Sequence, residues 1–189
     1  MHDSWGFPDR YHIVQYPAPG APELADRVRA LLRGPGTPVR DFPDRGLDHG
    51  ASVPLAETYP DADVPVLQVS MPTLEPERLV RMGRALAPLR DEGVLIVGSG
   101  FFTSNLAALR EPGTPSWSVE FDDWGQRALA AHDVDALLDF ERKAPAARLA
   151  HPRTEHFVAL GAAGDDLTAQ QVAVDGFWWG LATRSVQFG

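Results

Sequence analysis

Histidines are the residues of this chain best suited to moving protons or holding a metal, because imidazole titrates near neutral pH and is a common metal ligand. The chain has six, and three of them lie in two short polar motifs. His49 lies in RGLDHGASVPL, residues 45–55, between an acid and a glycine. His151 and His156 open and close the segment HPRTEH. Both motifs are therefore candidate functional sites.

The spacing of His151 and His156 argues against a pair of metal ligands on one helix. Positions five residues apart on a helix with ~3.6 residues per turn point in directions that differ by roughly 140°. If Pro152 is the first helical residue, His151 lies just outside the helix and His156 lies within it. The motif therefore favours one imidazole as a ligand and the other as its neighbour.

The segment GSGFFT, residues 98–103, is a second pattern that could serve a site. It lacks the third glycine of a dinucleotide-binding fingerprint, and the chain has no Gly-Lys-Ser/Thr phosphate loop, so nucleotide binding is disfavoured. Ser99 and Ser104 are candidate nucleophiles, but neither lies in a Gly-x-Ser-x-Gly elbow. A serine hydrolase that pairs Ser104 with His49 or His156 is a minor alternative.

Two apolar runs rich in β-branched residues are expected to position these segments. Residues 64–70 and 94–97 read as buried strands, and residues 76–90 between them read as a helix. A strand, a helix and a strand in this order predict a parallel crossover. The glycines after residue 97 would then lie at the carboxyl end of the sheet, where open α/β sheets bind ligands.

The whole pattern predicts one α/β domain over residues 1–189, with a mostly parallel central sheet flanked by helices and a mainly helical C-terminal part. A further short strand is predicted at 37–42, and the aromatic run at 177–181 is expected to be core or a pocket wall. Further helices are predicted at 22–33, 52–58, 105–110, 117–131 and 134–142, and from Pro152 onward.

Composition excludes several classes of partner. The formal net charge of −9 weighs against nucleic acid, because a binder needs Lys and Arg to replace the counterions of the phosphates. Because the chain has no cysteine, any metal site must use His, Asp, Glu or water. No apolar stretch approaches the ~20 residues of a membrane span, and the first residues do not resemble a signal peptide. We therefore expect a cytoplasmic protein.

Several motifs, in this order along the chain, resemble those of the LigB-type class III extradiol ring-cleavage dioxygenases, and specifically their DOPA-dioxygenase-like branch. The resemblance runs from about His2 to the end of the chain. The motifs that carry it are RGLDHGA with VPL at 45–55, VLIVGSG with Asn105-Leu106, and HP with EH and ALGAA at 151–163.

The resemblance implies a metal-dependent reaction in which dioxygen opens the ring of a small aromatic diol. It implies Fe(II) or Zn(II), with His156 as a metal ligand and His49 as a residue that contacts substrate or oxygen. Ser104 occupies the position of the family's acid–base histidine. Asp48, Asn105 and His151 are expected to line the substrate pocket.

Two departures from the family pattern bear on activity. The Ser-His-Gly and Ser-Ala-His-Trp motifs that supply metal-binding histidines near the beginning of family members do not occur in these 189 residues. At position 104 the family has histidine between Thr and Asn-Leu, where this chain has serine. A serine hydroxyl cannot shuttle protons near neutral pH as an imidazole does.

These departures lead to two expectations. In the first, the chain is N-terminally incomplete relative to the family, and catalysis by it alone is impaired. In the second, it is a divergent, metal-poor and non-catalytic scaffold or regulatory homologue that associates with itself or with a complete paralogue. Strand edges and apolar surface left exposed by missing strands would favour such association.

Overall fold

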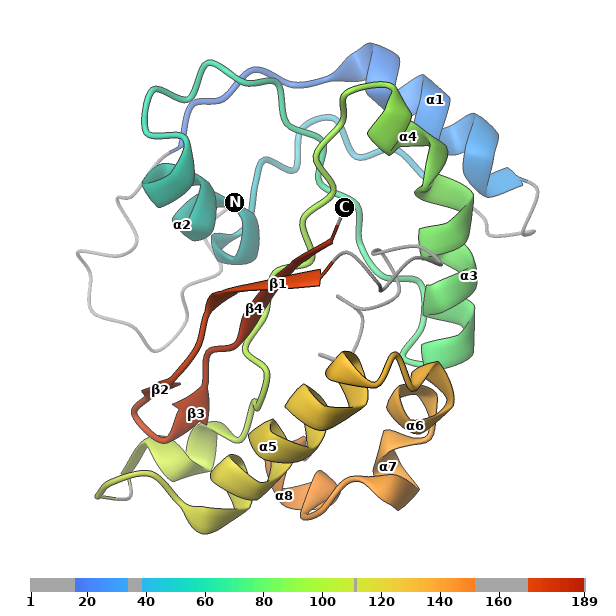
Figure 1. Ribbon diagram of the computed structural model, residues 1–189. Coiled ribbons are helices and arrows are strands. Elements are labelled where there is room, and N and C mark those ends of the chain that lie inside the picture. Colours follow the sequence, from blue (N-terminus) through green and yellow to red (C-terminus); the bar gives the residue numbers. More distant parts are fainter. Residues whose placement is uncertain (1–15, 34–38, 111, 152–169, 189) are drawn as a thin grey trace. The chain divides into compact units, whose positions relative to one another are not determined.

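The structure is a computed structural model that describes residues 16–33, 39–110, 112–151 and 170–188 (Figure 1). The chain divides into two compact units, residues 1–72 and 73–189. Helices and strands are both present, as the predicted mixed fold class requires. No helix in the described part of the chain is long and apolar enough to cross a membrane.

Among its described residues, 16–33 and 39–72, the first unit contains the helices α1 (Pro22–Arg33) and α2 (His49–Thr58). The predicted helix at 22–33 is confirmed, with Val28 and Leu32 buried on its inner face. Helix α2 begins three residues earlier than predicted, because Asp48 caps its first turn. With the described residues, the predicted strand at 64–70 forms a single bridge, in which Val66 pairs in parallel with Gly20.

In the second unit, the predicted helix at 76–90 is interrupted. It forms α3 (Pro76–Leu86) and α4 (Pro88–Asp91). The break falls at Pro88, which has no N–H to donate to the preceding turn. Leu79, Leu86 and Leu89 are nevertheless buried, so the predicted apolar face is largely kept across the break.

Four helices then gather into the main core of this unit, and Figure 1 shows them together in yellow and orange. They are α5 (Ser116–Ala130), α6 (Val134–Leu138), α7 (Phe140–Lys143) and α8 (Ala147–Ala150). The helix predicted at 134–142 is therefore divided at Asp139. A short 3₁₀ helix, η2 (Leu106–Arg110), replaces the α-helix predicted at 105–110. Phe121 and Phe140 are among the most deeply buried side chains.

The described strands are short and antiparallel. β1 (Gln170–Val174) pairs with β4 (Ser185–Phe188), and β2 (Phe177–Trp178) pairs with β3 (Leu181–Ala182). The predicted helical C-terminal part is thus wrong for residues 170–188, where β1 and β4 form an antiparallel ladder. The helix predicted from Pro152 lies outside the described residues.

The mostly parallel central sheet is not confirmed by the described residues. Residues 94–97, predicted as a buried strand, form no ladder there. Leu95 and Val97 are 65% and 58% exposed, so this apolar run has little cover from the described chain. An apolar run becomes a strand only when neighbouring strands take up its backbone hydrogen bonds.

A buried ion pair joins α5 to the loop between β3 and β4. Arg184 donates from Nε and Nη2 to the two carboxylate oxygens of Asp122, at 2.8 and 2.7 Å. Both side chains are only 6% exposed. Hydrogen bonding to Asp122 raises the pKa of Arg184 above its ordinary value. The guanidinium and the carboxylate are therefore held together by two charge-assisted hydrogen bonds that are largely shielded from water.

Replacing Arg184 by methionine should lower the free energy of unfolding by about 3 kcal/mol or more, because it leaves the Asp122 carboxylate buried without its partner. Urea denaturation measures the change. The matched control is Arg142→Met, since Arg142 pairs with Asp139 at 3.5 Å but is 84% exposed. Similar losses of unfolding free energy in the two variants would show that the buried Arg184–Asp122 pair stabilises the fold no more than an exposed pair does.

Candidate functional site

The N-terminus of α2 is organised by Asp48. Its carboxylate accepts a hydrogen bond from the backbone N–H of Ala51 at 3.2 Å, and its carbonyl accepts one from Ser52 at 2.8 Å. This is the ordinary role of aspartate before a helix, where it satisfies N–H groups that lack an internal partner. His49 is the first residue of the helix and is exposed. The cap therefore fixes the backbone from which the His49 side chain projects.

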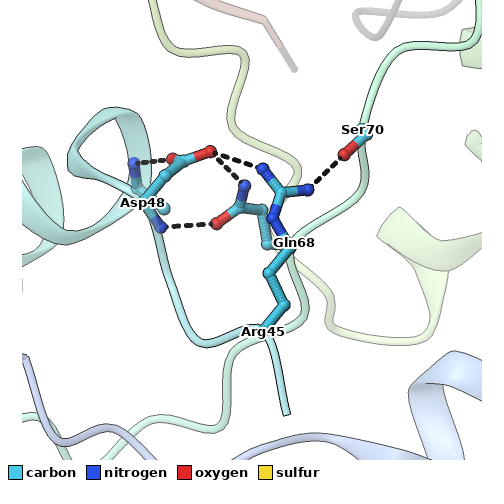
Figure 2. Close-up of polar contacts among 5 residues, drawn as sticks. Arg45, Asp48, Gln68 and Ser70 are labelled. Atoms are coloured by element: carbon cyan, nitrogen blue, oxygen red, sulfur yellow. Dashed lines mark hydrogen bonds and ion pairs between the residues drawn. The ribbon is translucent and has the colours of Figure 1, made fainter. Parts of the chain in front are cut away.

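Gln68, in the neighbouring extended segment, makes two hydrogen bonds with Asp48 (Figure 2). Its amide oxygen accepts from the backbone N–H of Asp48 at 3.0 Å, and its amide nitrogen donates to the Asp48 carboxylate. Arg45 adds a longer contact from Nη2 to the same carboxylate at 3.4 Å and donates from Nη1 to the Ser70 hydroxyl at 2.8 Å. The loop before α2 is thus tied to residues 68–70 through side chains.

In the second unit the structure brings together Ser104 and His151, two predicted site residues that lie 47 positions apart. The Ser104 hydroxyl lies 3.2 Å from Nδ1 of His151. His151 is 5% exposed, and its ring meets the rings of Phe121 and Phe140 at steep angles, 69° and 82°, with centroids 5.1 and 5.8 Å away. The imidazole is therefore held by aromatic contacts beside a half-buried hydroxyl.

The backbone around Ser104 is fixed on two sides. The N–H of Ser104 donates to the carbonyl of Ala150 at 2.8 Å, and the N–H of Phe102 donates to Ala182 at 3.0 Å. Thr103 between them is fully buried, and its hydroxyl accepts from the N–H of Ala182 at 2.8 Å. It also lies 3.2 Å from the hydroxyl of Ser118. Ser104 can therefore shift only if these bonds break.

Two further predicted site residues are Asn105 and His156. The Asn105 side chain accepts from the backbone N–H of Ala107 at 3.2 Å, so it caps η2. His156 lies outside the described residues, and its predicted role as a metal ligand stays a prediction. Asp48 and His49 belong to the first unit, whereas Ser104, Asn105 and His151 belong to the second.

The described residues do not fit a metal site. Across 16–33, 39–110, 112–151 and 170–188, no group of three His, Asp or Glu side chains could hold a metal ion. A pocket of about 320 Å³ in the second unit is lined by Leu109, Thr114 and Trp179, among others, and by none of the predicted site residues. The chemistry that the described site can support is proton handling by imidazole and hydroxyl groups.

Sequence reasoning missed Gln68 and the Thr103–Ser118 pair. Gln68 had one available signal, because it is a polar residue inside an otherwise apolar run, residues 64–70. A polar residue at such a position is normally bonded to something. Thr103 had no such signal, since its partners come from segments far along the chain.

The chain is similar to known proteins over most of its length. A family model described as the catalytic LigB subunit of aromatic ring-opening dioxygenase matches residues 3–178. Proteins named 4,5-DOPA dioxygenase extradiol are 45% identical over 180 residues in Beta vulgaris and 37% identical over 179 residues in Mirabilis jalapa. Each alignment covers 91% of this chain and 67% of the relative, so the chain spans about two thirds of their length.

A solved structure resembles the fold as well. The crystal structure of an uncharacterized protein from Escherichia coli K12 superposes with a TM-score of 0.80 at 33% sequence identity. The superposition covers 94% of this chain and 76% of that chain. The likeness therefore extends to backbone architecture.

Replacing Asp48 by alanine should lower the free energy of unfolding by about 1–2 kcal/mol, because the α2 cap is lost together with the contacts that Gln68 and Arg45 make with the carboxylate. Asp48→Asn should cost less, since an amide oxygen still caps. The control is Asp133→Ala, which removes a cap on Ala136 alone. If Asp48→Ala lowers the free energy of unfolding no more than Asp133→Ala does in thermal or urea denaturation, the hydrogen bond from Gln68 to the Asp48 carboxylate contributes nothing to stability.

Proposed function

We propose that this chain, which belongs to the LigB family of aromatic ring-opening dioxygenases, takes small aromatic diols as substrates and by itself opens their rings slowly or not at all. The single observation that carries the second part is the Ser104 hydroxyl at the position where the family pattern has an imidazole. The first part is supported by relatives named 4,5-DOPA dioxygenase extradiol.

The roles proposed for individual residues follow the family pattern. His156 is proposed as a ligand of Fe(II) or Zn(II), and His49 as the residue that contacts the diol or dioxygen. Asp48 fixes the backbone of His49 through the helix cap, which is supported by its bonds to Ala51 and Gln68. Asn105 and His151 are proposed to line the pocket. We also propose that the protein acts in the cytoplasm.

A metal would supply the activation of dioxygen, but the described residues offer no ligand set for it. What this chain's own residues can do is orient the diol and accept its protons. Removal of a hydroxyl proton prepares a diol for ring opening, and a positioned base typically contributes ~10²–10⁴-fold in rate. Serine lacks that capacity near neutral pH, so its presence at position 104 supports weak catalysis.

Oxygen uptake should be slow when the isolated 189-residue chain is supplied with Fe(II) and a panel of catechols. Metal analysis after dialysis should find less than one Fe or Zn per chain, and His156→Ala should lower it further. Uptake is measured with an oxygen electrode, and ring opening by absorbance. Rapid turnover, or a full equivalent of metal retained, would contradict the proposed impairment.

A second candidate function, assembly with another copy of this chain, is favoured by a stack of exposed aromatic rings. Trp178 stacks on Phe101 and on Trp179, with centroids 5.7 and 5.4 Å apart. The three side chains are 49%, 38% and 65% exposed, respectively. Trp179 lies in the two-residue turn between β2 and β3 with a φ of 50°, and Gly180 follows with 81°. Exposed aromatic rings of this kind are typical of interface cores.

Trp179→Gly should weaken self-association without loosening the turn, because glycine adopts a positive φ without strain. Sedimentation velocity at micromolar concentration should show a dimer for the parent chain and a larger monomer fraction for the variant. Leu149→Ala is the control, since Leu149 is an exposed apolar residue outside the stack. A parent chain that sediments as a clean monomer would rule out this function.

A further inference from the structure

We propose that Ser104 and His151 together form a two-step proton relay, which replaces the single imidazole expected at position 104. The inference rests on the proposed function, because the proton in question comes from the hydroxyl of a bound aromatic diol. In this arrangement the Ser104 hydroxyl contacts the substrate. His151 accepts the proton that the serine passes on. The relay restores, in part, the acid–base capacity that a serine alone lacks.

The geometry of the pair supports the second step. The Ser104 oxygen and Nδ1 of His151 are 3.2 Å apart, within range for a hydrogen bond. If the imidazole carries its proton on Nε2, Nδ1 is an acceptor and the serine hydroxyl donates to it. His151 is almost completely buried, whereas Ser104 is only half-buried. Of the two groups, the serine hydroxyl is therefore the more accessible to a ligand.

Neighbouring residues hold the Ser104 hydroxyl and the His151 imidazole in fixed positions. Phe121 and Phe140 contact the imidazole at 69° and 82°, which restricts rotation of its ring. The bond from Ser104 N–H to the Ala150 carbonyl joins the serine backbone to the residue that precedes His151. The hydroxyl and the imidazole are thus attached to one another through main chain and side chain. Such pre-organisation lets a proton move without rearrangement of the site.

The transfer balances without any further reactant. The O–H bond of the diol breaks as its proton forms a new O–H bond with the Ser104 oxygen. The original O–H bond of Ser104 breaks, and that proton forms an N–H bond with Nδ1 of His151. The products are a diol anion, an unchanged serine and an imidazolium. The reverse sequence can return the proton to an intermediate or product.

The experiment uses 4-nitrocatechol without oxygen, because its ionised form has a distinct visible absorption and no turnover is needed. Binding to the full chain should produce the ionised band, and the ring nitrogens of ¹⁵N-labelled His151 should shift toward imidazolium values. Ser104→Ala and His151→Asn should each move the ionisation of the bound probe by about one pH unit or more, toward the neutral form. The double variant should add little, because the two residues act as one path.

Three comparisons separate a relay from a packing role. Ser104→Thr retains a hydroxyl and should restore the ionised band, whereas Thr183→Val removes a half-buried hydroxyl elsewhere in the unit and should leave it unchanged. In a Ser104→His background, loss of His151 should no longer matter. Circular dichroism checks that each variant is folded.

Each result decides a different claim. Binding with equal ionisation in the parent, Ser104→Ala and His151→Asn chains would overturn the relay and leave the proposed function standing. Absence of any 4-nitrocatechol binding would overturn the proposed diol pocket, and the relay with it. Ionisation that follows the Ser104 hydroxyl and the His151 imidazole supports both.

Discussion

Residues 102–104 hold the second unit together, because between them they bond to three other parts of the chain. Phe102 and Thr103 bond to Ala182, Thr103 also meets Ser118 of α5, and Ser104 bonds to Ala150 of α8. The Phe102 ring lies so close to α5 that a Cβ at Gly125 would come within 2.3 Å of it. Segments from α5, α8 and β3 are therefore ordered by their contacts with one extended stretch.

In each unit, a side chain from an extended segment bonds to a backbone N–H of another element. The extended segments 64–70 and 94–104 form few strand-like bonds among the described residues. Gln68 satisfies the backbone of Asp48, and Thr103 satisfies that of Ala182. Buried or half-buried polar groups rarely stay without such partners, because the cost of leaving them unsatisfied exceeds the gain from a single bond.

The helices could be predicted from sequence because their signals are local. Apolar spacing located α1, α3 and α5 closely, and Pro88 was a visible reason to end α3 early. The strands could not be predicted as well, since a β-rich run such as 94–97 becomes a strand only beside a suitable neighbour. The candidate site shows the same limit. His49 and its cap are local, but the pairing of Ser104 with His151 depends on how α8 packs against residues 102–104.

The stacked indoles of Trp178 and Trp179 also give this protein an optical property. Two indole rings with centroids 5.4 Å apart and planes inclined by 19° are close enough for their electronic transitions to couple. Coupled transitions of this kind split into bands of opposite sign in circular dichroism. Because one of the rings lies in a turn that needs a positive φ, the splitting would report whether the β2–β3 hairpin is intact. The stacked pair is thus a spectroscopic label built into the β2–β3 hairpin.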